Sequence, residues 1–134
     1  MLKYLLDTNA CINYLKFSNS PIRAKLQSLA VDEIAVCSVV KFELYYGSYR
    51  SSDPVRSLEK QNQFLVQFRS LNFGDPEAVE AGKIRASLAS IGKMIGAYDI
   101  QIAAISLTND LTLVTHNTSE FSRIENLKLE DWQI

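Results

Sequence analysis

The feature that most constrains the fold is an N-terminal apolar run that ends at a carboxylate. Residues 1–6 are apolar except for Lys3, and Asp7, Thr8 and Asn9 follow directly. The run is too short for a helix with its own cap, so it is typical of a buried strand that ends in a loop. In an α/β sheet, ligands bind just beyond the carboxyl ends of the strands. An acid at residue 7 therefore predicts an active site there.

The length and composition favour one globular unit. A chain of 134 residues fits a single domain that buries on the order of two-thirds of its unfolded surface, so we expect one domain over residues 1–134. No apolar run approaches the roughly 20 residues of a membrane span, and the first residues do not resemble a signal peptide. We therefore expect a cytoplasmic protein without a membrane partner.

Cysteine content and charge exclude several classes of site. Cys11 and Cys37 stand alone in the sequence, so a disulfide framework, a zinc ribbon and a redox motif all lack their spacing. A net charge of −1 argues against nucleic-acid binding by bulk electrostatics but allows a basic rim around an acidic centre. The candidates for that rim are Lys16, Lys41, Arg50, Lys93, His116 and Arg123.

Strand-like and helix-like segments alternate along the chain. This order predicts a three-layer α/β/α sandwich with a mostly parallel central sheet. After the first strand, we expect strands at residues 33–38, 71–73, 111–115 and 127–129. We expect helices after Asp7, from Pro21, over 39–49 with Ser38 as the cap, over 55–68, over 76–91 with Val79, Ile84, Leu88 and Ile91 turned inward, and over 98–107.

Asp7 and Asp99 each have a structural interpretation beside the chemical one. Asp7 precedes a predicted helix and suits an N-cap. Asp99 lies in the first turn of a helix that is apolar nearly all round, where an acid interacts favourably with the helix dipole. Either acid can therefore serve folding, catalysis or both.

Glu43 is harder to explain structurally. It shares a helix face with Val39 and Val40, where an ionised carboxylate is costly unless a positive or hydrogen-bonding group meets it. The structural alternative is a salt bridge to Lys41 or Arg50, but partners on one helix face lie three or four residues apart, and neither has that spacing. The pattern favours a functional role for Glu43.

The predicted strand ends gather Asp7, Asp99 and either Asn117 or Glu120, with Glu43 beside them. Oxygen ligands without cysteine or histidine suit Mg²⁺, with Mn²⁺ as a substitute, rather than zinc. His116, the single histidine, has no partner at ligand spacing. Two carboxylates about 4 Å apart repel by roughly 4 kcal/mol at an effective dielectric constant of 20, so such a cluster needs its ion. A bound ion activates water and braces a phosphodiester displacement.

Four motifs, in order, resemble those of PIN-domain ribonucleases, and within them the VapC toxins of bacterial toxin–antitoxin pairs. The similarity is collinear and spans nearly the whole chain. The motifs are Leu5-Leu6-Asp7-Thr8-Asn9, Phe42-Glu43-Leu44 with Tyr46-Gly47, Ile95-Gly96-Ala97-Tyr98-Asp99 with Ile102-Ala103-Ala104, and Leu113-Val114-Thr115-His116-Asn117-Thr118-Ser119-Glu120-Phe121.

The resemblance implies metal-dependent cleavage of RNA, often a transfer RNA, by a homodimer that a cognate VapB-type antitoxin neutralises. Position by position, Asp7, Glu43 and Asp99 are implied as metal-site acids, with Thr8 and Asn9 orienting the first. An antitoxin groove is expected on the third and fourth helices, with candidates Tyr45, Tyr46, Tyr49, Leu58 and Leu65.

The fourth acidic position departs from the plainest family pattern. Many relatives have an aspartate where this chain has Asn117, and others have asparagine followed by an acid three residues later, as in Asn117 and Glu120 here. We favour Glu120 as the fourth catalytic and metal-site acid and Asn117 as its supporting polar neighbour.

Other classes fit less well. A haloacid-dehalogenase-type phosphatase needs a second aspartate where this chain has Asn9. A receiver domain needs its phospho-acceptor aspartate after a middle strand, whereas Asp53 lies in a turn. A dinucleotide-binding enzyme needs a Gly-x-Gly-x-x-Gly turn, and none is present. The main alternative is a catalytically silent PIN-like module that binds RNA or protein, and the intact acidic set argues against it.

Overall fold

The core of the protein is one five-stranded parallel sheet. The structure is a computed structural model that describes residues 1–134. The strand order is β3-β2-β1-β4-β5, and all four neighbouring pairs are parallel. The strands are β1 (Tyr4–Leu6), β2 (Ile34–Cys37), β3 (Arg69–Leu71), β4 (Thr112–Val114) and β5 (Lys128–Glu130).

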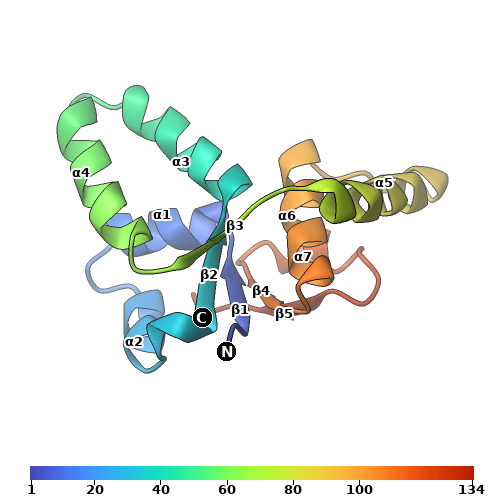
Figure 1. The fold of residues 1–134 in the computed structure, drawn as a ribbon, viewed down its shortest axis with the longest axis horizontal. Coiled ribbons are helices and arrows are strands. Elements are labelled where there is room, and N and C mark those ends of the chain that lie inside the picture. The colour runs from blue at the N-terminus through green and yellow to red at the C-terminus, as the bar shows by residue number, and fades with distance from the viewer.

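Helices cover both faces of this sheet, which confirms the predicted three-layer α/β/α sandwich (Figure 1). A first group packs on one side: α1 (Thr8–Lys16), α2 (Pro21–Gln27), α3 (Ser38–Tyr49) and α4 (Pro54–Leu65). A second group packs on the other: α5 (Asp75–Ser90), α6 (Ala97–Thr108) and α7 (Thr118–Phe121), while a 3₁₀ turn at Val31–Glu33 precedes β2. The helices α3 and α4 form a hairpin that projects from the body, and α5 extends away on the opposite side.

The apolar runs of the sequence become the buried elements. All four residues of β2 are buried, as expected for a strand covered on both faces. Six residues of α6 are buried, which agrees with its nearly uniform apolar composition. Together with β1 and β4 they contribute to a core of 30 buried apolar residues. None of the helices combines the length and the apolar character that a membrane span requires.

The chain reverses its direction of travel across the sheet between β1 and β4. From β1 it proceeds through the first helix group to β2 and β3, whereas β4 leads through α7 to β5 on the other side. Adjacent strands whose connections leave in opposite directions open a crevice at their carboxyl ends. Asp7 follows β1 and Thr115 follows β4, so both lie at this crevice.

Three sequence predictions about the elements were wrong in detail. Ser38 is the first residue of α3 rather than its cap, because the cap position is occupied by Cys37, without a side-chain hydrogen bond. The third strand is Arg69–Leu71, since its pairing with β2 ends at Leu71 opposite Cys37. Val79 and Ile91 are exposed rather than turned inward, because α5 projects from the body and buries only Ile84 and Leu88.

The predicted start of α2 is confirmed, whereas α4 begins one residue before its predicted start and also ends early. The Ser20 hydroxyl accepts from the Ile22 amide at the start of α2, where Pro21 is the first helical residue. The Asp53 carboxylate caps α4 in the same way ahead of Pro54, but α4 ends at Leu65, three residues before the predicted end.

Candidate active site

Asp7 combines the structural and the chemical interpretation. It is the N-cap of α1, and its Oδ1 accepts a hydrogen bond from the Ala10 amide at 2.8 Å. Its own amide donates to the Val114 carbonyl at 3.1 Å, which ties the end of β1 to β4. Only 4% of the Asp7 residue surface is exposed. The cap therefore holds a buried carboxylate in one position at the crevice.

The environment of Asp7 penalises its negative charge. Burial raises the pKa of the Asp7 carboxyl from 3.8 to about 6, against the lowering effect of hydrogen bonds from Thr115 and Ala10. The charges of Asp99 and Glu43 raise it further. No lysine or arginine forms a salt bridge with Asp7. The carboxylate thus lacks the cation that would stabilise it in the folded chain.

Glu43 reaches the same crevice from α3. The Thr8 hydroxyl donates to Glu43 Oε1 at 2.6 Å, so the residue after Asp7 orients the second acid. The alternative salt bridges to Lys41 or Arg50 do not form, and Arg50 donates instead to the Tyr46 hydroxyl. The resemblance assigned Thr8 to orient Asp7, whereas in the structure it donates to Glu43.

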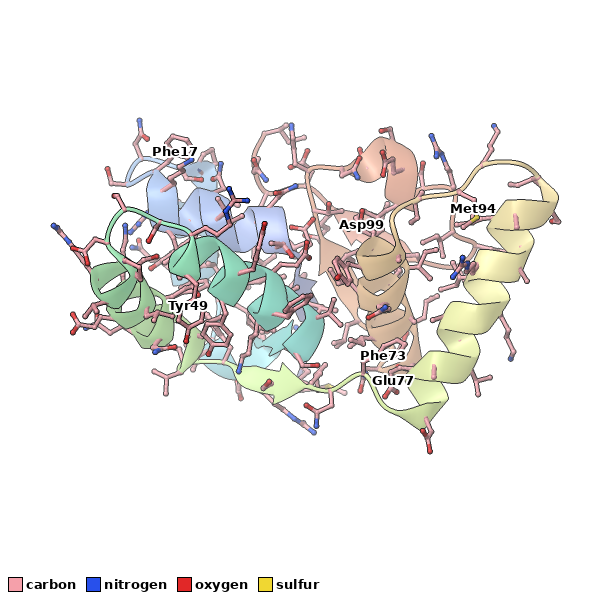
Figure 2. All side chains as sticks on the ribbon, turned by 90° about the horizontal axis from the view of Figure 1, so that it is seen from above. Phe17, Tyr49, Phe73, Glu77, Met94 and Asp99 are labelled. Atoms are coloured by element: carbon pink, nitrogen blue, oxygen red, sulfur yellow. The ribbon has the colours of Figure 1, made fainter.

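Asp99 lies half-buried in the first turn of α6 (Figure 2). It does not cap the helix, because the cap position is Gly96, without a side-chain hydrogen bond. Burial raises the pKa of the Asp99 carboxyl, and the charges of Glu43 and Glu120 raise it further. Asp99 is therefore an acid whose charge the fold leaves uncompensated.

Asn117 and Glu120 act as a pair at the end of β4. The Asn117 amide nitrogen Nδ2 donates to Glu120 Oε2 at 3.1 Å, and the Asn117 backbone amide donates to the Thr115 hydroxyl at 3.0 Å. The Glu120 charge acts on Asp99. Asn117 thus orients Glu120 as a polar neighbour. That Glu120 is the fourth metal-site acid stays a prediction.

The structure brings these acids close enough for their charges to interact, but their oxygens do not converge. Asp7 interacts with Asp99 and Glu43, and Asp99 interacts with Glu43 and Glu120. No three of the histidine, cysteine, aspartate and glutamate side chains are placed to enclose a metal ion. The set nevertheless contains only oxygen donors and is paired with no cation, and such donors are the ligands that a hard divalent ion takes.

Softer ligands are not offered to this site. Burial raises the pKa of the Cys11 thiol well above its ordinary value and that of Cys37 to about 11, so neither is a thiolate at neutral pH. His116 Nδ1 lies 2.8 Å from Asp131 Oδ2. The protonated thiols and the contact of His116 with Asp131 therefore leave the carboxylate and amide oxygens as the candidate metal ligands.

Sequence reasoning missed one residue and gave a supporting role to another whose side chain forms no hydrogen bond in the structure. Thr115 was assigned only to a buried strand, although its hydroxyl contacts both Asp7 and the Asn117 amide. The signal was a hydroxyl at a strand end just before two polar residues. Asn9 is exposed and makes no side-chain hydrogen bond, so its supporting role stays a prediction.

A groove leads away from Glu43 between α1, α3 and α4. This hairpin groove has a volume of about 500 Å³ and an apolar lining of Ile12, Leu15 and Leu44. Its polar and charged lining consists of Lys16, Ser48, Ser51, Ser57, Lys60 and Gln61, with Glu43 at the end that meets the acids. None of the residues predicted for an antitoxin groove lines this one: the three tyrosines lie on other surfaces of α3, Leu58 is not in its lining, and Leu65 is buried in the core. Which of these surfaces an antitoxin covers stays a prediction.

Comparisons with known proteins place the chain in a family. A family model described as "PIN domain" matches residues 4–127. The tRNA(fMet)-specific endonuclease VapC of Salmonella typhimurium is 36% identical over 132 residues, which cover 98% of this chain and 99% of the relative. Ribonuclease VapC2 of Haemophilus influenzae is 37% identical over 132 residues, with the same coverage of both chains.

A solved structure agrees with this similarity. The crystal structure of DNA-bound VapBC from Salmonella typhimurium contains a chain with a TM-score of 0.93 and 36% identity to this one. The match covers 98% of this chain and 99% of that one. The chain therefore belongs to the PIN-domain family, among the VapC ribonucleases.

Proposed function

We propose that the chain is a metal-dependent endoribonuclease toxin that hydrolyses phosphodiester bonds of transfer RNA and is inhibited by a VapB-type antitoxin. The observation that carries this proposal is a buried aspartate, surrounded by further acids and no cation, at the crevice between β1 and β4. Relatives named as VapC ribonucleases support RNA as the substrate, and one named for tRNA(fMet) supports the transfer-RNA class. A cytoplasmic location is part of the proposal because that substrate lies there.

Asp7, Glu43, Asp99 and Glu120 would hold Mg²⁺, or Mn²⁺ in its place. A bound ion supplies an activated water and stabilises the charge that develops on the phosphodiester. The chain supplies orientation: Ala10 and Thr115 fix Asp7, while Thr8 fixes Glu43. Asp7, with a pKa of about 6, gives up its proton when it becomes a ligand.

The alternative is a PIN-like module that binds RNA or protein without cutting. Crowded acids without a counter-ion reduce the folding stability of the chain. An enzyme needs such acids to hold its metal ion, whereas a module that only binds has no use for them. The intact acidic set therefore favours an enzyme.

The direct test is a cleavage assay on purified transfer RNA with the purified chain. We expect cleavage with Mg²⁺ or Mn²⁺, none with excess chelator, and recovery when the ion is restored. Sequencing of the new RNA ends identifies the bond. Intact RNA at saturating Mg²⁺ and Mn²⁺ supports the silent module, and equal cleavage in chelator contradicts the metal requirement.

We propose that the antitoxin occupies the hairpin groove, since the groove joins an apolar lining to Glu43. Solved VapBC complexes support a partner of this kind. A guanidinium on a flexible segment in the groove meets the unpaired acids bidentately. We therefore expect an arginine-bearing antitoxin peptide to inhibit cleavage, and excess Mg²⁺ to reverse the inhibition in part.

The control for this prediction is the same peptide with its arginines replaced by glutamine. A rate assay at increasing Mg²⁺ concentration compares the two peptides. If both inhibit completely and Mg²⁺ changes neither, the inhibition is steric and the acids are not the contact.

A further inference from the structure

Two side-chain pairs join the segments that flank β4 and β5, one at each end of these parallel strands. At the amino ends, Lys128 Nζ lies 3.0 Å from Asp110 Oδ1. At the carboxyl ends, His116 Nδ1 lies 2.8 Å from Asp131 Oδ2. Asp7 follows the carboxyl end of the neighbouring strand β1, so only the histidine pair shares the edge of the sheet with the candidate acids.

The pair at the carboxyl ends is the more firmly held of the two. The Asp131 side chain is 13% exposed, against 90% for Asp110. Both oxygens of Asp131 are engaged, since Oδ2 contacts His116 and Oδ1 accepts from the Gln133 amide at 2.9 Å. An exposed ion pair such as that of Lys128 contributes little to stability. A fixed carboxylate at Nδ1, in contrast, sets the orientation of an imidazole ring and leaves the other nitrogen for a ligand.

The second ring nitrogen of His116 has no partner in the chain. The contact with Asp131 at Nδ1 is the only hydrogen bond of this side chain, which is otherwise exposed. A protonated imidazole donates from both of its nitrogens. With Asp131 at Nδ1, such a ring lacks an acceptor at Nε2, and a phosphate oxygen forms strong hydrogen bonds with charged donors.

The neighbours of His116 in the chain place it beside the acids. Thr115, which precedes it, contacts Asp7, and Asn117, which follows it, donates to Glu120. Consecutive Cα atoms lie about 3.8 Å apart, so the backbone of the histidine is within one residue of both contacts. The ring itself meets its partner after β5, so it lies on the β5 side of β4, whereas Asp7 lies on the β1 side.

The backbone already joins β4 and β5 at this end. The Thr115 amide donates to the Glu130 carbonyl at 2.9 Å, next to the register that pairs the two strands. A contact between an exposed histidine and an aspartate adds little stability to strands that are already paired. It does provide an oriented donor at the edge of the sheet that carries the acids, and such a donor suits the binding of an anion.

We propose that His116 binds an RNA phosphate that flanks the scissile phosphate, and that Asp131 is the positioning residue for its ring. This proposal deepens the proposed function and rests on it. An RNA strand that presents one phosphate to the acids carries further phosphates on either side, and one on the β5 side meets the imidazole. Contacts with phosphates fix the register of a nucleic acid on a protein. His116 therefore helps to hold the scissile bond at the acids.

The direct test is nuclear magnetic resonance of the imidazole. His116 is the only histidine, so a tag-free protein gives one pair of ring ¹⁵N signals. A single-stranded oligouridine is added to the Asp7→Asn protein with Mg²⁺ present. We expect the Nε2 signal to move until the protein is saturated, and uridine, which has no phosphate, to leave it in place. No movement at a saturation that fluorescence anisotropy confirms, or an equal movement with uridine, overturns the proposal.

The second test compares affinities for the same oligouridine by fluorescence anisotropy, again in the Asp7→Asn protein. His116→Ala should weaken binding by about 10-fold, the loss expected for one hydrogen bond to a charged group. It should also lower the slope of log affinity against log salt by about 0.7, which corresponds to one phosphate contact on a single strand. Asp131→Ala should weaken binding when His116 is present but not in the His116→Ala protein, because it acts through the ring.

The matched control is Lys128→Ala, which removes the cation of the pair at the amino ends of the same two strands. The two side chains are similarly exposed, at 57% for Lys128 and 61% for His116. The control should leave affinity and salt slope unchanged, and thermal unfolding checks the folding of each variant. Unchanged affinity in His116→Ala overturns the proposal, and so do equal losses in both variants. A loss of affinity without a change in slope indicates a structural role and also overturns it.

Failure of the His116 contact and failure of the proposed function give different results. Normal Mg²⁺-dependent cleavage by the native chain, with an unmoved Nε2 signal and unaltered binding in His116→Ala, overturns the contact alone. Absent cleavage, together with a moving Nε2 signal and weaker binding in that variant, overturns the nuclease and supports an RNA contact at His116.

Discussion

Replacement of Asp7 by asparagine is expected to reduce Mg²⁺-dependent RNA cleavage by more than about 100-fold, or about 2.7 kcal/mol of transition-state stabilisation. Asparagine keeps an oxygen for the Ala10 amide, so the start of α1 persists. It removes the charge that the ion requires. Initial rates at saturating Mg²⁺, with circular dichroism as a check on folding, measure the effect.

The chain provides a matched control at a second N-cap. Asp53 caps α4 by accepting from the Arg56 amide, as Asp7 caps α1, but Asp53 is exposed and remote from the acids. Asp53→Asn should therefore leave cleavage unchanged. If Asp7→Asn retains cleavage as well as Asp53→Asn does, then Asp7 is only a helix cap and the catalytic assignment is wrong.

The free energy of unfolding of the metal-free protein is expected to fall by roughly 2 kcal/mol, through Asp7 alone, as the pH rises from about 4 to about 7. The Asp7 pKa is about 6 when folded, against 3.8 for an unperturbed carboxyl. Between these values the folded chain binds more protons than the unfolded chain, so stability decreases with rising pH. Above the Asp7 pKa of about 6 in the folded chain, the whole destabilisation caused by burying the ionised carboxylate is present.

Asp7→Asn isolates this contribution. The variant should be more stable than the parent near neutral pH and nearly equal to it near pH 4, because the other carboxylates titrate alike in both proteins. Urea denaturation over this pH range, with chelator present, gives the two curves. Parallel curves would show that the carboxylate is stabilised by groups other than a metal ion.

The sheet was predictable because its strands are buried on both faces. Such strands appear as short apolar runs, and their alternation with helices leaves a parallel arrangement as the simple solution. Strand ends were less predictable, since pairing decides them: β3 stops where its partner β2 stops, at Leu71 opposite Cys37. The exposure of Val79 could not be predicted, because it depends on how far α5 projects beyond α6.

The acids of the candidate site stood out for a physical reason. A carboxylate at a strand end or on an apolar helix face violates local rules, and Asp7 and Glu43 do so visibly. Thr115 violates none, because a threonine in a strand is ordinary. Its contact with Asp7 depends on the pairing of β1 with β4, and a single sequence carries little trace of such long-range neighbours.

The central pairing of β1 with β4 also affects when the nuclease exists during synthesis. Asp7 is translated early, but its neighbours Thr115, Asn117 and Glu120 come from the last part of the chain. Until those residues leave the ribosome, the crevice between β1 and β4 lacks its β4 side. The growing chain therefore has no complete acid cluster until Glu120 has emerged, so up to that stage the nascent chain is not an active nuclease beside its own ribosome.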